Sequence, residues 1–295
     1  MTNKIRKAVF PAAGLGTRFL PETKAIPKEM LPVVDKPLIQ YSVEEAVASG
    51  VESVLIITGR DKAPIENHFD ISFELEQVLK ERGKDDEFRE VRAVTELAKI
   101  SYTRQKQALG LGHAIYQAKD FVGDEPFAVL LPDDMVDAEP PALKQMVDVF
   151  EKFNAPVIAT MQVEGEAISR FGVIDADEVE PGIFRIRDMV EKPPLAEAPS
   201  DLAIIGRYIF TPDIFGAIEQ TKPGAGGEIQ ITDAMRLLLK TRPFYALKLE
   251  GTRHDAGDKL GFLIANVEYA LKRDDLGQDL REYLASLNLS AKGAS

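Results

Sequence analysis

A chain of 295 residues with 45% hydrophobic side chains is long enough to bury the core of one large α/β domain or of two smaller ones. Its 36 lysines and arginines against 48 aspartates and glutamates give a net charge of −12, which argues against nucleic acid as the main partner. The absence of cysteine excludes disulfides, thiolate zinc sites and cysteine nucleophiles, and it indicates a reducing compartment.

The sequence carries no signal of export or of membrane insertion. The N-terminus, Met-Thr-Asn-Lys-Ile-Arg-Lys, lacks the long apolar run of a signal peptide, and no apolar run approaches membrane-spanning length. We therefore expect a cytoplasmic location and no membrane partner.

Strand-like apolar runs alternate with amphipathic segments through roughly the first half of the chain. Strands are expected at residues 8–10, 53–58, 100–103, 127–131 and 156–163, and helices at 38–49, 73–82, 112–119 and 142–153. This alternation is typical of βαβ units and predicts an α/β fold with a mostly parallel sheet. Because such sheets bind ligands at the carboxyl ends of their strands, the segments after residues 10 and 131 are the first candidates for a site.

The segment after the first strand, Phe-Pro-Ala-Ala-Gly-Leu-Gly-Thr-Arg-Phe-Leu-Pro at residues 10–21, combines small side chains with fixed positive charge. Small residues let backbone N–H groups approach an anion, and Arg18 and Lys28 add cations within reach of the same loop. We interpret it as a polyphosphate-binding loop, with a Gly-rich turn and solvated cations as the alternative. The spacing excludes a Walker loop, and Phe19 stands where a dinucleotide fingerprint needs its third glycine.

Paired acids follow the buried strand at residues 127–131. Adjacent carboxylates at Asp133 and Asp134 repel each other, and Mg²⁺ favours one or two protein carboxylates together with phosphate oxygens. A strand-end turn or a helix cap explains the pair equally well, and the same alternatives apply to Asp255 and Asp258. Three histidines and no cysteine argue against zinc.

Beyond about residue 165 the pattern changes to short strands, helices and Gly/Pro loops. The short strands are expected at residues 172–175, 183–190, 203–210 and 245–249, and we interpret them as an extension of the same domain. Two last helices are expected at 259–272 and 276–287. The final one places Leu276, Leu280, Tyr283, Leu284 and Leu287 on one face, which fits docking on its own domain or a subunit interface equally well.

Several motifs spread along the chain resemble those of one enzyme family. They are the loop at 10–21, KAIPKEMLPVVDKPLI (24–39), IENHFD (65–70), GLGHA (110–114), EKP (191–193), GGEIQITDA (226–234) and HDAGDKLG (254–261). Together they resemble the sugar-nucleotide pyrophosphorylases, and in particular the bacterial branch that joins UTP to glucose 1-phosphate.

The resemblance implies a fold and a reaction. The fold is α/β, with a Rossmann-like, mostly parallel mixed sheet of the nucleotidyltransferase type and a sugar-binding extension; residues 1–275 form the catalytic domain and 276–295 a possible oligomer contact. The reaction converts UTP and glucose 1-phosphate into UDP-glucose and pyrophosphate, by in-line attack with Mg²⁺ and without a covalent intermediate. A relative using dTTP or CTP, or a non-catalytic nucleotide-sugar sensor, stays as an alternative. The resemblance also implies a homotetramer, as a dimer of dimers, or a homodimer.

The resemblance also implies roles for individual residues. Those assigned to catalysis are Arg18, Lys28 and Lys192; to the nucleotide, Ala12, Ala13, Gly14, Gly16, Gln105 and Gly110; to the sugar, Gly172, Glu191, Lys192 and Gly206; and to the metal, Asp133 and Asp255. Without it, Gln105 and Gly110 suggest only a strand end and a helix cap, and Glu191 and Lys192 only a solvated pair. Because a glutamine amide can flip, we expect Gln105 to need help from backbone groups to distinguish uracil from cytosine.

Overall fold

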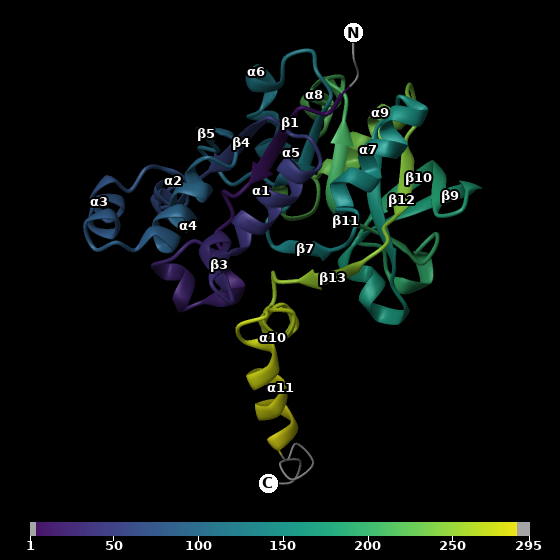
Figure 1. Cartoon of the computed structure of the whole chain (residues 1–295). Coiled ribbons are helices and arrows are strands. Elements are labelled where there is room, and N and C mark those ends of the chain that lie inside the picture. Colours follow the sequence, from purple (N-terminus) through teal and green to yellow (C-terminus); the bar gives the residue numbers. More distant parts are fainter. Residues whose placement is uncertain (1–3, 288–295) are drawn as a thin grey trace.

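The computed structural model describes residues 4–287, and its centre is a nine-stranded mixed sheet (Figure 1). In spatial order the strands are β5 (Lys99–Arg104), β4 (Ser53–Thr58), β1 (Lys7–Pro11), β6 (Phe127–Leu130), β11 (Leu202–Phe210), β8 (Val157–Gln162), β12 (Tyr245–Lys248), β10 (Ile183–Glu191) and β9 (Gly172–Glu180). The helices are α1 (Leu38–Ala48), α2 (Ala63–Phe69), α3 (Phe73–Glu81), α4 (Asp85–Thr95), α5 (Leu111–Tyr116), α6 (Lys119–Val122), α7 (Ala142–Phe153), α8 (Ile214–Gln220), α9 (Ile231–Leu239), α10 (Lys259–Leu271) and α11 (Gly277–Ser286).

The first half of the sheet is parallel, as the alternating pattern predicts. Strands β5, β4, β1 and β6 pair in parallel, so their carboxyl ends meet at one edge. The apolar runs of β1, β4 and β6 are buried because helices cover both faces of the sheet. One core joins these strands to α1, α2 and α7, and a second joins them to α5, α8 and α9.

The second half of the sheet is mainly antiparallel. Strand β11, buried along its whole length, runs antiparallel to β6 and β8, and β10 runs antiparallel to β12 and β9. The expectation of a short strand at 172–175 is wrong in extent, because β9 continues to Glu180 as one arm of a hairpin with β10. The polar residues in the second half of β9 show no apolar pattern that predicts a strand, because they form the exposed part of that hairpin. The single helix expected at 112–119 is instead divided into α5 and α6.

A separate two-stranded sheet connects distant parts of the chain at the edge of the core. Strand β7 (Asp134–Asp137) pairs antiparallel with β13 (Thr252–Asp255), and their register sets Asp134 opposite Asp255. The two acidic motifs, more than a hundred residues apart in the sequence, therefore lie side by side.

Helices α10 and α11 project from the sheet body and carry the chain toward its C-terminus (Figure 1). Asp258 caps α10, since its carboxylate accepts a hydrogen bond of 2.9 Å from the Gly261 N–H; of the alternatives given for that acid, this is the helix cap. Among residues 4–287, no helix is both long enough and apolar enough to cross a bilayer.

Candidate active site

The loop after β1 turns sharply through glycine and alanine. Ala12 is buried in the core and its N–H donates to Ile57 O at 2.8 Å, so only its carbonyl is left to face a ligand. Gly16 has φ +66°, and a Cβ there would lie 3.2 Å from Cβ of both Lys28 and Thr23. Glycine at 16 is therefore required by the backbone and by close packing, whether or not a phosphate is bound.

A small cavity opens over this loop. It has a volume of about 230 Å³, and its lining includes the predicted nucleotide-binding residues Ala13 and Gly14 together with Lys28. Arg60 and Lys62, which the sequence analysis did not select, line the same cavity. The ammonium of Lys62 is paired with the buried carboxylate of Glu29 at 2.7 Å.

A larger cavity of about 570 Å³ collects the remaining predicted residues of the catalytic, metal and sugar groups. Its lining includes Arg18, Asp133, Gly172, Glu191, Lys192, Gly206 and Asp255. These residues lie on the first loop, after the end of β6, on the β9–β10 hairpin, on β11 and at the end of β13. Cations and carboxylates that the sequence separates by up to 237 positions thus share one hollow at the carboxyl ends of the parallel strands.

The carboxylates of Asp133 and Asp255 converge on one point. A Cβ added to Gly257 would lie 2.8 Å from Asp133 Oδ2 and 3.1 Å from Asp255 Oδ1, so the missing side chain leaves room between the two oxygens. Lys28 Nζ binds Asp133 Oδ2 at 2.6 Å. Burial works to raise the pKa of Asp133, but the charge of Lys28 and its hydrogen bond outweigh burial and hold that pKa below its usual value. Asp133 is therefore an anion at neutral pH.

Asp134 is held by hydrogen bonds within the protein. Its Oδ2 accepts a hydrogen bond of 2.6 Å from the Gly206 N–H, and its Oδ1 accepts one of 2.5 Å from Arg253 Nε. A Cβ at Gly206 would lie 2.8 Å from Asp134 Cβ and 2.9 Å from Leu131 Cβ. Packing against Asp134 is thus sufficient to require glycine at 206, independently of any sugar.

Glu191 and Lys192 end β10 at the far side of the large cavity. Thr232 Oγ1 donates to Glu191 Oε2 at 2.7 Å, and Lys192 Nζ lies 3.2 Å from Glu191 Oε1. Lys192 has φ +47°, a left-handed conformation that is uncommon for residues other than glycine. A Cβ at Gly172 would lie 3.3 Å from Glu191 Oε2, so glycine there keeps this carboxylate accessible.

Gln105 and Gly110 lie outside the lining of both cavities. Gln105 directly follows β5, and its backbone N–H donates to Thr58 O at 2.9 Å, which places it beside the carboxyl end of β4. Gly110 has φ +94°, and a Cβ there would lie 2.7 Å from Glu228 Cβ. The side chain of Gln105 is buried and hydrogen-bonded to Gly110 O.

Several polar residues of the large cavity were missed by sequence reasoning, among them Arg170, Tyr208, Thr232 and Arg253. Thr232 lies in the 226–234 motif and Arg253 directly precedes the 254–261 motif, whereas Arg170 lies two positions before Gly172 and outside every motif. Tyr208 is hidden within the apolar run of β11, where nothing in the sequence distinguishes it from a core residue.

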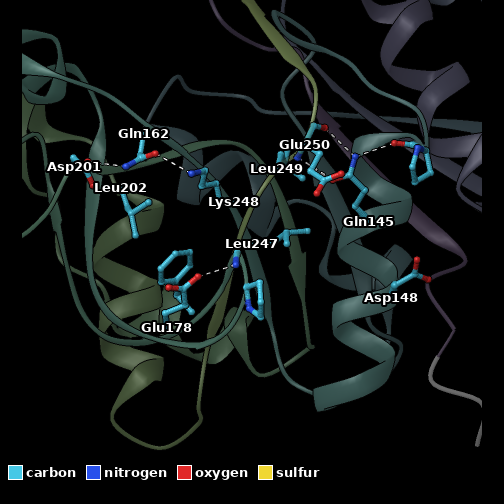
Figure 2. Close-up of a pocket in the computed structure, with 14 residues that line it drawn as sticks. Gln145, Asp148, Gln162, Glu178, Asp201, Leu202, Leu247, Lys248, Leu249 and Glu250 are labelled. Atoms are coloured by element: carbon cyan, nitrogen blue, oxygen red, sulfur yellow. Dashed lines mark hydrogen bonds between the residues drawn. The ribbon is translucent and has the colours of Figure 1, made fainter.

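A third cavity, of about 710 Å³, is the largest of the three but has the wrong chemistry for a phosphate (Figure 2). Asp148, Glu178, Asp201 and Glu250 line it, against the single cation Lys248. Its polar groups largely satisfy one another: the amide of Gln162 donates to Asp201 and accepts from Lys248, for example. An anionic ligand would be repelled here.

The chain matches the nucleotidyl transferase family over residues 7–272. It is 51% identical over 286 residues to a UTP–glucose-1-phosphate uridylyltransferase of Staphylococcus epidermidis, an alignment that covers 97% of this chain and 99% of that protein. The corresponding enzyme of Bacillus subtilis is 51% identical over 284 residues, which cover 96% of this chain and 97% of the enzyme.

Solved structures resemble the whole chain as well. A crystal structure of UDP-glucose pyrophosphorylase complexed with UDP-glucose is 48% identical, with a TM-score of 0.84 over 91% of this chain and 100% of that one. A UTP-bound UDP-glucose pyrophosphorylase from Acinetobacter baumannii is 40% identical, with a TM-score of 0.90 over 96% of this chain and 99% of that one.

Proposed function

The chain belongs to the nucleotidyl transferase family, and we propose that it transfers the uridylyl group of UTP to glucose 1-phosphate, giving UDP-glucose and pyrophosphate. The observation that carries this proposal is the large cavity in which Arg18, Lys192 and the acids Asp133 and Asp255 meet beside the glycine loop. The near full-length identity to uridylyltransferases specifies the nucleotide and the sugar.

The reaction needs positioning and charge neutralisation rather than a protein nucleophile. A phosphate oxygen of glucose 1-phosphate forms a bond to the α-phosphorus of UTP while the bond from that phosphorus to the bridging oxygen of pyrophosphate breaks. The attacking group is already an anion, so no base has to remove a proton. Lys192 orients the sugar phosphate, Lys28 and the glycine loop hold the triphosphate, and Arg18 neutralises the leaving pyrophosphate.

Asp133 and Asp255 form a suitable site for Mg²⁺, which would supply positive charge to the reacting phosphates. Their oxygens converge on the space beside Gly257, and hard oxygen donors suit this ion. Within residues 4–287 there is no group of three or more metal-ligating side chains, so the remaining ligands would come from substrate phosphates and water. Lys28 bridges the two parts of the site, because it binds Asp133 and also lines the loop cavity.

We expect a strong preference for UTP over CTP and a weaker one over dTTP. Cytosine exchanges a donor for an acceptor, which leaves buried polar groups unpaired, whereas a methyl-sized difference alone discriminates only about 10–200-fold. Competition kinetics with mixed nucleotides and glucose 1-phosphate measure both ratios. The prediction fails if CTP is used as well as UTP.

The C-terminal helices suggest self-association. On α10, Leu260, Leu263, Ile264 and Val267 form one apolar stripe and remain 37–68% exposed. The apolar face predicted for the final helix, α11 with its flanking residues, is only partly exposed to solvent. Leu276, Tyr283 and Leu287 are exposed, and Leu280 and Leu284 are half-buried. We therefore propose a homo-oligomer, as a homotetramer (dimer of dimers) or a homodimer, with residues 1–275 as the catalytic domain and 276–295 contributing to the contact. Of these ranges, residues 1–3 and 288–295 lie outside the described residues.

Light scattering at micromolar concentration should give at least twice the monomer mass of 32.5 kDa. Leu263→Glu and truncation before Leu276 should each lower that mass, because both remove apolar contact area. Val179→Glu, at another exposed apolar position on β9 (44% exposed, against 61% for Leu263), serves as the control. A full-length monomer would contradict the proposed assembly, and an unchanged mass in the truncated protein would remove α11 from the contact.

The remaining expectations concern location and partners. We propose a cytoplasmic enzyme with small-molecule substrates, on the basis of a cysteine-free, acidic chain.

A further inference from the structure

A small apolar cluster lies apart from the two main cores of the protein. Its buried members include Leu31, Met135 and Ala256, and the partly buried ring of Phe19 packs against them. Helix α10 contributes to the same cluster through Phe262 and through other residues of its inner face. We call it the α10 cluster.

The α10 cluster connects the segments that carry the charged residues of the proposed site. Phe19 follows Arg18, Ala256 follows Asp255, Met135 lies two positions after Asp133, and Leu31 lies three positions after Lys28. Packing in one cluster therefore helps to set the relative positions of segments that lie far apart in the chain. The segments of Asp133 and Asp255 are also joined by the pairing of β7 with β13, whereas the loop that carries Arg18 belongs to no sheet.

The turn that carries Arg18 is a single 3₁₀ turn, Thr17–Phe19, whose other side chains lie mostly in solvent. Arg18 is exposed, and Leu15 and Leu20 are 76% and 50% exposed, whereas Phe19 is half-buried. The Phe19 N–H donates to Gly16 O at 3.0 Å, a hydrogen bond that stays within the turn. The ring of Phe19 is therefore a main point of attachment for the turn.

The ring of Phe19 meets the ring of Phe262 edge to face, with ring centroids 5.6 Å apart and an angle of 79° between the planes. Phe262 lies near the start of α10, where its N–H donates to the carbonyl of the capping residue Asp258 at 2.9 Å. Arg18 Nη1 reaches the same segment through its bond of 3.4 Å to Gly257 O. Arg18 and Phe19 thus both contact the segment at 257–262.

We propose that Phe262 is a positioning residue for Arg18: its ring holds Phe19, and with it the turn that presents the guanidinium to the large cavity. This inference rests on the proposed uridylyltransferase activity, in which Arg18 neutralises the leaving pyrophosphate. A displacement of about 1 Å in a group that acts on the transition state can cost about 10²-fold in rate. Phe262 lines neither cavity of the site, so it acts through Arg18 and not on the substrate.

The test measures Phe262→Ala in two backgrounds. In the wild-type background we expect kcat to fall by about tenfold and the KM for UTP to stay within about twofold. In the Arg18→Ala background the position of the turn no longer matters, so we expect Phe262→Ala to change kcat by less than about twofold. An equal loss in both backgrounds, or no loss in the wild-type background, would overturn the proposal.

Three further variants control for stability. Phe262→Tyr keeps the edge-to-face contact and should retain kcat within about threefold of the wild type. Phe262→Leu keeps the apolar volume without the ring, and it replaces Phe262→Ala if the alanine variant does not fold. Phe153→Ala removes another half-buried ring, one that stacks on Tyr245 at 4.1 Å outside both cavities of the site, and it should leave kcat unchanged. A loss in Phe153→Ala equal to that in Phe262→Ala would reduce the role of Phe262 to general stability and overturn the proposal.

A second measurement needs no turnover. Hydrogen exchange of the backbone amides of residues 13–20, followed by mass spectrometry, should be at least about tenfold faster in Phe262→Ala than in the wild type, with exchange in β1 and β4 unchanged. Unchanged exchange at 13–20 would show that Phe262 does not hold the turn, and would overturn the proposal. If the wild-type protein does not turn over UTP, the proposed function fails, and the exchange experiment still decides whether Phe262 holds the turn.

Discussion

The variant Asp133→Asn should lose about 10³-fold or more of kcat with UTP and glucose 1-phosphate. The asparagine has the same shape and still accepts a hydrogen bond from Lys28, but it removes the negative charge that faces Asp255 across the space beside Gly257. The site would then hold Mg²⁺ with one carboxylate fewer. Initial rates of pyrophosphate release, measured over a range of Mg²⁺ concentrations, test this expectation.

Folding should be affected much less than turnover. The Lys28–Asp133 pair is largely buried, with 23% and 21% of the two side chains exposed, so the loss of the anionic partner of Lys28 should cost about 1–3 kcal/mol of unfolding free energy. Asp148→Asn is the matched control, because Asp148 lines the acidic third cavity (Figure 2), which shares no lining residue with the two cavities of the proposed site. If Asp133→Asn turned over at the wild-type rate with Mg²⁺ present, Asp133 would not be a metal ligand.

Arg18→Ala should lower kcat by about 10²–10³-fold and leave the KM for UTP nearly unchanged. Negative charge accumulates on pyrophosphate only as it departs, so a guanidinium aimed at the leaving group acts mainly in the transition state. The structure leaves this side chain available: Arg18 is exposed, and its hydrogen bond to Gly257 O is 3.4 Å long.

Two further variants define what Arg18 contributes. Arg18→Lys keeps the charge but loses the planar guanidinium group, and its kcat should lie between those of the wild type and of Arg18→Ala. Arg89→Ala removes an exposed arginine on α4, far along the chain from every motif, and should leave both constants unchanged. A rise in KM without a loss of kcat in Arg18→Ala would mean that Arg18 only binds substrate.

Much of the fold follows from local patterns in the sequence. The apolar runs of β1, β4 and β6 and the amphipathic periods of α1 and α7 predict these elements to within a residue or two, because each is decided by burial along one strand or one helix face. The antiparallel half of the sheet was not predictable in the same way. Strand β9 is half-exposed and polar, and its pairing with β10 depends on a hairpin rather than on its own composition.

The site was predictable in its residues but not in its connections. Motif resemblance selected Asp133 and Asp255, and only the pairing of β7 with β13 shows why two acids so far apart in sequence face each other. The sequence analysis assigned Gly206 to the sugar and Gly16 to the nucleotide, but packing within the protein also accounts for both. The absence of a side chain leaves room for Asp134 beside Gly206, and for Lys28 and Thr23 beside Gly16. The hydrogen bond from the Gln105 side chain to Gly110 O joins the end of a strand to the start of a helix, and no local pattern predicts it.

The uridylyl transfer itself is tested most directly by mixing the purified protein with UTP, glucose 1-phosphate and Mg²⁺ and following the phosphorus species by ³¹P NMR. We predict that UDP-glucose and pyrophosphate appear in equal amounts, and that neither forms when glucose 1-phosphate is left out. A nucleotide-sugar sensor would bind UDP-glucose and leave UTP intact under the same conditions. UTP that remains unchanged, or pyrophosphate released without a matching amount of UDP-glucose, would contradict the proposed reaction.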